Sequence, residues 1–154
     1  MSTPSIRPAE AADATPACAV LRRSIAELCA VDHRNDPAQL AAWLSNKTPA
    51  NIAAWIDNPD NVVLVAVIED RIAGVAAMTH AGVVTLNYVS PDARFQGVSK
   101  ALLGGLEAKA VGLGLTQCRL ASTLTARRFY EAAGYRAQPG ATPGGGIPMV
   151  KDLG

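Results

Sequence analysis

Apolar residues in the first third of the chain recur with the period of a helix. From residue 14 onward they step by four and three positions, which places them along one side of an amphipathic helix. This spacing predicts a helix over residues 14–30 with Asp13 as its N-cap. Asp36-Pro37 and Thr48-Pro49 each place a capping side chain before a proline, which is typical of a helix start. We therefore expect a helical N-terminal third that follows a short strand at residues 5–7.

The pattern changes to that of β-strands after residue 60. Three β-rich apolar runs separated by short turns predict an antiparallel meander, with strands at Val62–Ile68, Ile72–Met78 and Val83–Val89. The rest of the chain predicts a long helix that ends near Gly112, a strand Leu115–Ala121, a helix Ala126–Ala133 capped by Thr125, and strands Tyr135–Gln138 and Ile147–Lys151. This order of elements is α+β, or mixed α/β, and not a regular alternation of strand and helix. The length of 154 residues is that of one domain, so we expect a single domain over residues 1–154.

The charge balance, the apolar runs and the cysteines give no indication of nucleic-acid binding, membrane insertion or a zinc site. Lys and Arg number 14 against 13 Asp and Glu, so no overall positive field attracts nucleic acid or an anionic membrane. No apolar run is long enough to span a bilayer, and the first 30 residues lack the apolar core of a signal peptide. The 3 cysteines form no C-x-x-C pair and have no histidine at zinc-ligand spacing. We expect free thiols, no metal and a cytoplasmic, reducing compartment.

A strand end, a loop of small residues and the start of the long helix follow one another between Val89 and Ser99. The first turn of a helix carries backbone N–H groups without an intrahelical acceptor, and such groups bind phosphate oxygens. Arg94 and Lys100 add positive charge at the same point. From the spacing alone, a plain tight turn into a helix explains the segment as well as anion binding does.

Two segments resemble motifs of the GNAT superfamily of N-acyltransferases. The pattern Val89-x-Pro91-x-x-Arg94-x-x-Gly97-x-Ser99 is similar to that family's acetyl-CoA loop, with Ser99 where the family usually has Gly or Ala. Residues 126–135, which contain Phe129-Tyr130 and end in Gly134-Tyr135, are similar to a second motif of the family.

The resemblance implies a twisted mixed sheet, flanked by helices, that opens between its fourth and fifth strands. It also implies acetyl-CoA as cosubstrate, with its pyrophosphate on the backbone amides of residues 95–99. The cofactor-binding residues that we expect are Val89, Arg94, Phe95, Gln96, Gly97, Val98, Ser99, Lys100 and Thr125.

The resemblance gives Tyr130 the role of general acid, which protonates the departing CoA thiolate. A general base is harder to assign. The positions of the fourth strand that we expect to face the acceptor are Val83, Thr85 and Asn87, and none of them takes up a proton at neutral pH. We therefore expect a water relay, or an acceptor amine that is already weakly basic.

The acceptor side has a few further candidates. We expect Thr85 and Asn87 to contact the substrate, together with Asp32 and His33 after the first helix, a region that shapes the acceptor pocket in the family. His80, at the turn into the fourth strand, is a candidate base. Asp32 and both histidines are explained equally by exposed loop positions.

These observations lead to one hypothesis and one alternative. The hypothesis is an N-acetyltransferase that moves the acetyl group of acetyl-CoA directly to a primary amine of a small molecule, or to a polypeptide amine, in a ternary complex. Many family members form homodimers, and the sequence leaves that option open. The alternative is a catalytically silent acyl-CoA-binding or interaction domain with the same fold, which the missing carboxylate on the fourth strand favours.

Overall fold

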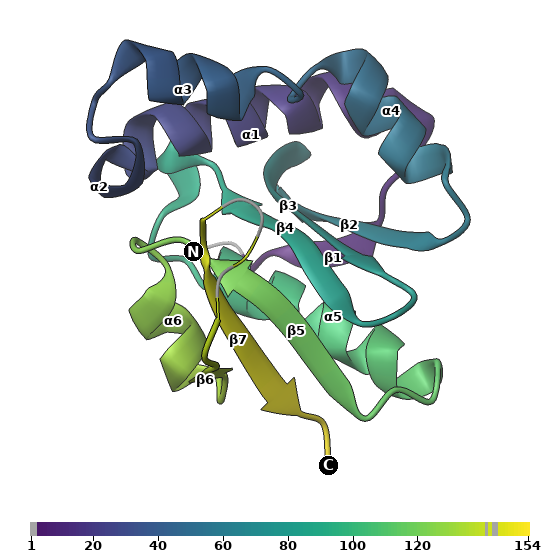
Figure 1. Ribbon diagram of the computed structural model, residues 1–154. Coiled ribbons are helices and arrows are strands. Elements are labelled where there is room, and N and C mark those ends of the chain that lie inside the picture. The colour runs from purple at the N-terminus through teal and green to yellow at the C-terminus, as the bar shows by residue number, and fades with distance from the viewer. Residues whose placement is uncertain (1–2, 141, 143–144) are drawn as a thin grey trace.

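One seven-stranded mixed sheet, in the order β1-β2-β3-β4-β5-β7-β6, runs through the computed structural model, which describes residues 3–140, 142 and 145–154 (Figure 1). Its strands are β1 (Ser5–Pro8), β2 (Asn61–Ile68), β3 (Arg71–Thr79), β4 (Val83–Val89), β5 (Gln117–Ser122), β6 (Arg136–Ala137) and β7 (Ile147–Asp152). All neighbouring strands pair antiparallel except β4 and β5, which pair parallel. The predicted meander of the second to fourth strands is confirmed.

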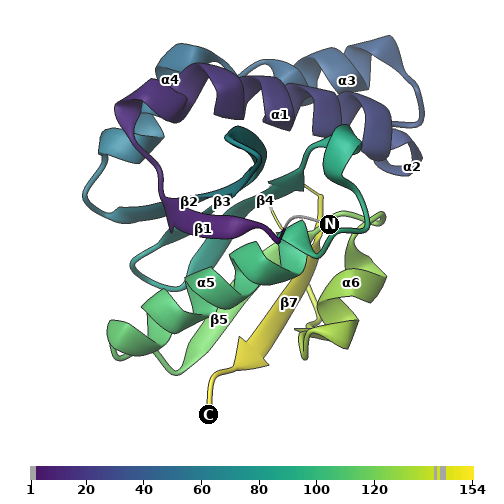
Figure 2. The same ribbon diagram turned by 180° about the vertical axis from the view of Figure 1, so that it is seen from behind.

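Helices cover both faces of the sheet. They are α1 (Ala14–Leu28), α2 (Ala30–His33), α3 (Pro37–Leu44), α4 (Pro49–Asp57), α5 (Val98–Gly112) and α6 (Arg127–Ala132), with short 3-10 turns η1 (Ala11–Asp13) and η2 (Pro91–Ala93). Helices α1, α3 and α4 form one layer, and α5 crosses the opposite face, as the view from behind shows (Figure 2). The two predicted proline-led starts are confirmed, because Asp36 accepts from the Ala38 amide at 2.9 Å and Thr48 from the Asn51 amide at 3.2 Å.

Neither of two predicted capping side chains caps its helix. Asp13 occupies the N-cap position of α1, as predicted, but its side chain makes no capping hydrogen bond there, because its carboxylate accepts from the Arg7 guanidinium at 2.7 and 3.0 Å and from the Glu10 amide at 2.7 Å. The hydrogen bond from Arg7 lowers the pKa of Asp13 below its usual value. Thr125 does not cap α6 either, since the Ala126 amide donates to the hydroxyl of Thr123 at 3.1 Å. In both places the side chain that local sequence assigns to the helix cap hydrogen-bonds elsewhere in the chain, Asp13 to Arg7 and Thr125 to Asp32.

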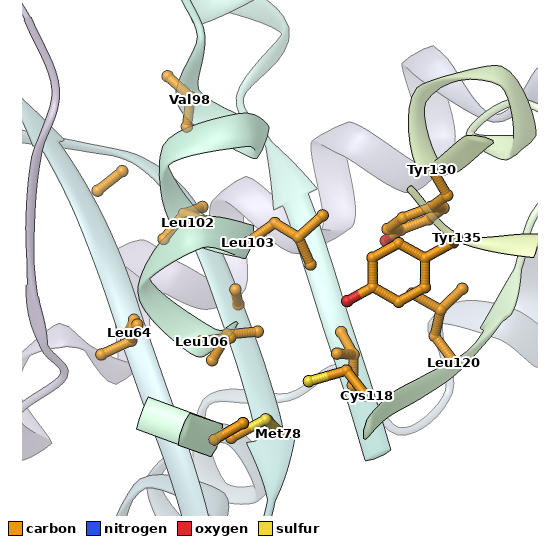
Figure 3. Close-up of a cluster of buried hydrophobic side chains, with 14 of the residues drawn as sticks. Leu64, Met78, Val98, Leu102, Leu103, Leu106, Cys118, Leu120, Tyr130 and Tyr135 are labelled. Atoms are coloured by element: carbon orange, nitrogen blue, oxygen red, sulfur yellow. The ribbon is translucent and has the colours of Figure 1, made fainter. Parts of the chain in front are cut away.

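The larger cluster of buried apolar side chains lies between α5 and the sheet (Figure 3). Leu102 and Leu106 of α5 face Leu64 and Met78, all of them almost fully buried. Helix α5 lies close against the sheet at Gly74 of β3. An added Cβ there would stand 2.5 Å from Cγ1 of Val98, 2.9 Å from Cδ1 of Leu102 and 3.0 Å from the carbonyl oxygen of Tyr88. Gly74 therefore fixes how closely the first turn of α5 approaches the sheet.

A bulge interrupts the alternation of β4. Leu86 pairs with Ala77 and Val84 pairs with Met78, so Thr85 is an extra residue in the ladder. Val84 consequently packs in the cluster under α5, whereas Leu86 packs in the cluster under α1. The expectation that Val83, Thr85 and Asn87 share one face is therefore wrong, because the bulge reverses the facing of every residue after it.

A substitution at Gly74 tests the close approach. We expect Gly74→Ala to lower the free energy of unfolding by about 1–3 kcal/mol in urea denaturation, because the methyl group displaces Val98 and Leu102 from a packed core. Gly104→Ala is the control, since a Cβ there meets nothing within 4 Å in α5, and it should raise stability by up to about 1 kcal/mol. Equal effects of the two substitutions would contradict the account.

Candidate functional site

The parallel pairing of β4 and β5 is short, and a hollow lies beyond it. Only Val83 with Arg119 and Val84 with Leu120 are in register. Past these pairs the two strands diverge, and a cavity of about 330 Å³ lies against residues 87–89 of β4. Its walls come from the end of α1, the segment from η2 to the start of α5, the loop after β5, and α6. Chain segments far apart in the sequence therefore meet at the point where the sheet opens.

The loop into α5 turns its backbone toward this cavity. Phe95 and Gly97 have left-handed φ angles of 64° and 76°, and Val98 begins the helix immediately afterwards. The amides of the first turn, at Val98 and Ser99, have no intrahelical acceptor. The Phe95 side chain is 92% exposed, and the Arg94 guanidinium lies 4.7 Å from its ring centroid. The segment thus combines free amides, a strained backbone and a positive charge at one edge of the cavity.

Most of the predicted cofactor residues line this one cavity. The exception is Gln96, which lines a separate hollow with Arg71 and Asp92 on the other side of the loop. Among the described lining residues of the main cavity, Arg94 and Lys100 carry charge and no carboxylate is present. The remaining predicted residues on its wall are Val89, Phe95, Gly97, Val98, Ser99 and Thr125. A positive, carboxylate-free edge suits a polyanionic group.

Tyr130 lies in the wall on the α6 side. Its ring is 7% exposed and makes edge-to-face contacts with Phe129 at 5.2 Å and Tyr135 at 5.6 Å between centroids (Figure 3 shows Tyr130 and Tyr135). Burial raises the pKa of Tyr130 to about 12, and a hydrogen bond from the side chain of Asn87 opposes part of that rise. The phenol is therefore protonated at neutral pH and can donate a proton.

Asn87 extends from β4 toward Tyr130. Both residues line the main cavity and also a smaller hollow of about 50 Å³ between β4 and β5. The Oδ1 atom of Asn87 is buried and has no hydrogen-bond partner in the part of the chain that the structure describes. Because a buried acceptor without a donor is costly, this oxygen marks a position where a ligand N–H or a water fits.

Asp32 and His33 occupy structural positions beside the cavity. Asp32 accepts hydrogen bonds from the amides of Leu124 and Thr125, at 2.5 and 3.2 Å, and from the Thr125 hydroxyl. It thereby fastens α2 to the loop that carries Thr125. The buried His33 ring lies 3.3 Å from the Ala26 carbonyl oxygen through Nε2 and accepts from the Asn35 amide through Nδ1. Neither side chain is among those that line the cavity.

His80 lies away from Tyr130. It is exposed at the turn between β3 and β4, its amide donates to the Asp60 carbonyl at 2.9 Å, and it borders a groove formed with Ile6 and Lys109. The structure thus brings together the predicted cofactor loop, Tyr130 and Asn87, and leaves His80 outside that group.

Sequence reasoning missed several residues of the cavity wall. Ser24, Leu28 and Cys29 from the end of α1, Tyr88 of β4 and Thr123 all line it. The pKa of Cys29 is raised to about 12 by burial, so its thiol is unreactive. The helical spacing marks the apolar side of α1 but does not say which of its turns closes a cavity. Tyr88 was missed because strict alternation along β4 left it out of the set of residues expected to face the acceptor.

The described residues lack two other features. No helix among them has both the length and the apolar character needed to cross a membrane. No group of three or more His, Cys, Asp or Glu side chains is placed to hold a metal ion in the same part of the chain.

Comparison with known proteins agrees with this geometry. Residues 31–151 match the family described as acetyltransferase (GNAT) domain. The fold is similar to a GCN5-related N-acetyltransferase from Rhodopseudomonas palustris, with TM-score 0.86, 26% identity, and coverage of 99% of this chain and 97% of that one. It is also similar to PaiA N-acetyltransferase from Thermoplasma acidophilum in complex with coenzyme A, with TM-score 0.85, 19% identity, and coverage of 97% and 99%. YncA from Salmonella typhimurium, solved with its cofactor acetyl-CoA, has TM-score 0.71, 18% identity, and coverage of 99% and 95%. No curated protein sequence matches the chain significantly.

The Asp32 carboxylate provides a test of how the cavity wall is held. Asp32→Ala removes the acceptor of both loop amides and the Thr125 hydroxyl, so we expect a loss of about 1–2 kcal/mol in the free energy of unfolding, measured in urea. The control is Asp57→Ala at the exposed end of α4, which should change stability by less than about 0.5 kcal/mol. If Asp32→Ala costs no more than its control, the carboxylate does not hold the loop.

Proposed function

Because the chain belongs to the acetyltransferase (GNAT) domain family, we propose that it transfers the acetyl group of acetyl-CoA directly to the primary amine of a small molecule. Both substrates would be bound together where β4 and β5 diverge. The observation that carries this proposal is that the cationic loop of Arg94 and the buried phenol of Tyr130 line one continuous cavity. A phosphate-binding end and a proton donor at the other end are the parts that acyl transfer from a CoA thioester requires.

The residues on the cavity wall suit successive parts of the donor. Arg94, Lys100 and the first-turn amides of α5 would bind the pyrophosphate oxygens. The apolar side chains of Val89 and Val98 would flank the pantetheine arm. Since pairing with β5 ends at Val84, the backbone of residues 85–89 on that side is free to hydrogen-bond the arm as a missing strand would. Two structural relatives solved with coenzyme A or acetyl-CoA support an acyl-CoA as the donor.

Tyr130 and Asn87 would carry the proton and the amine. As the amine nitrogen bonds to the thioester carbon and the carbon–sulfur bond breaks, the Tyr130 hydroxyl would give its proton to the departing sulfur. The nitrogen would release one proton to water as the amide forms, and a proton from water would restore the phenol. The raised pKa of Tyr130, about 12, keeps that proton in place until the sulfur becomes basic. The unpartnered Oδ1 of Asn87 would accept an N–H of the incoming amine and direct its lone pair toward the carbonyl carbon.

Deprotonation of the amine needs a route that uses no side-chain base. No carboxylate or imidazole belongs to the described residues that line the cavity. An alkyl ammonium with a pKa of about 10.4 is neutral about once in 2,500 molecules at pH 7, which adds roughly 4–5 kcal/mol to the barrier. An amine with a pKa near 8 loses only about one decade in rate. We therefore propose a water relay to solvent, or an acceptor whose amine is weakly basic.

Tyr130→Phe tests the proposal directly. We expect kcat for CoA release to fall by roughly 100-fold, with the KM for acetyl-CoA within about 3-fold of the wild type, because the hydroxyl acts mainly in the transition state. The matched control is Tyr135→Phe, since the Tyr135 hydroxyl donates to Glu107 at 2.9 Å in the α5 cluster. That control should keep its kcat even though it loses stability.

The same assay separates the alternative function. An unchanged kcat in Tyr130→Phe would contradict its role as general acid. Binding of acetyl-CoA without CoA release for any amine would favour a silent acyl-CoA-binding domain, for which the absence of a basic side chain at the cavity is the supporting observation.

A further inference from the structure

A second cavity lies beside α4, at Thr85 and Leu86 of β4. Its volume is about 280 Å³. Its polar lining consists of Asn46 and Lys47 from the α3–α4 loop, Asn61 at the start of β2, and Thr85 at the bulge of β4, with Trp55 of α4 beside them. No carboxylate is among the described residues that line it.

Lys47 is an unusual residue to find in such a wall, because it is only 8% exposed. Its ammonium donates to Oδ1 of Asn46 at 2.7 Å and lies 5.9 Å from the centroid of the Trp55 ring. It makes no ion pair with any residue that the structure describes. Burial lowers the pKa of Lys47, as expected for an ammonium without a counter-charge.

The backbone around Lys47 is firmly held. Its carbonyl accepts from the Arg22 guanidinium at 2.9 Å and from the Cys18 thiol at 3.2 Å, and its amide donates to the Leu44 carbonyl at 3.0 Å. The main chain of Lys47 is therefore held in place, and the ammonium at the end of its side chain contacts Asn46 and lies near the Trp55 ring. A buried cation without an anion is costly, and a bound anion would remove that cost.

The two cavities share part of their walls. Thr85 and Leu86 line both the Lys47 cavity and the small hollow that contains Tyr130 and Asn87. Thr85 and Asn87 are two residues apart, on the order of 7 Å along a strand. One small molecule can therefore place an amine near Asn87 and a second polar group beside Lys47.

We propose that Lys47 and its neighbours Asn46, Asn61 and Thr85 bind a carboxylate on the acceptor, so that the substrate is an amine whose carbon chain also carries a carboxylate. This inference rests on the proposed acetyl transfer. A single ammonium balances a single negative charge, and the amide and hydroxyl groups around it supply further donors to the second oxygen. The spacing favours an amine and a carboxylate at the two ends of a short chain.

Binding of matched acids and amides tests the site without turnover. The probes are ω-amino acids of three to six carbons and their primary amides, titrated calorimetrically into the protein alone and with CoA. We expect the best acid to bind about 10- to 100-fold more tightly than its amide, as a charge-assisted pair implies. Lys47→Met should reduce the affinity for the acid to that for the amide. The control, Lys109→Met, changes a lysine beside the groove on the other face of the sheet and should leave the ratio unchanged.

Several outcomes would overturn the inference. Equal binding of acid and amide by the wild type would do so, as would the lack of binding by every probe, and neither result depends on how well a variant folds. An equal loss of both affinities in Lys47→Met would show a structural role only. Acetate should compete with the acid in the wild type, and failure to compete would also count against the site.

CoA release with the same probes separates this inference from the proposed function. Acetylation of acids and amides with equal kcat/KM, unchanged in Lys47→Met, would leave acetyl transfer standing and remove the carboxylate site. Tight, Lys47-dependent binding of the acids without any CoA release would leave the site standing and remove the proposed function.

Discussion

The early end of the pairing between β4 and β5 is the constraint on which the rest of the structure depends. In a continuous sheet, the backbone N–H and C=O groups of residues 85–89 would hydrogen-bond to strands on both sides, because unpaired polar groups inside a protein are costly. Here the register stops at Val84 and Leu120, and α1 and α6 close around the space that results. The free edge of β4 consequently borders a cavity at the centre of the molecule, with the first turn of α5 beside it.

Two local features of the sheet determine what that surface presents. The bulge at Thr85 turns β4 so that Asn87 faces Tyr130, while Thr85 itself also lines the Lys47 cavity. The absence of a side chain at Gly74 lets α5 press against β3, which places the amides of its first turn next to the strand. The residues that we propose for the donor, the proton transfer and the acceptor are thus arranged around one short segment of one strand.

Much of this arrangement could be predicted from the sequence, for physical reasons that differ between elements. Helix starts at Pro37 and Pro49 and the three meander strands depend on local propensity and periodicity, which the sequence displays directly. The loop into α5 could be selected as a candidate cofactor site because its motif has fixed spacing. The bulge at Thr85 could not, since a uniform β-rich run carries no signal of where one residue is left unpaired. Lys47 lies in a polar stretch that is typical of a loop, and its burial arises only from tertiary packing of that loop, which contacts α1 and lies near the Trp55 ring.

The central claim is that the opened edge of β4 and the first turn of α5 form one acyl-CoA site, and hydrogen exchange of the backbone amides tests it most directly. The measurement compares the protein alone, with saturating acetyl-CoA, and with adenosine. The account predicts slower exchange with acetyl-CoA in peptides that cover residues 94–100 and 85–89, with α4 unchanged and no effect of adenosine on residues 85–89. Slower exchange elsewhere in the molecule, with both segments unaffected while acetyl-CoA is bound, would contradict it.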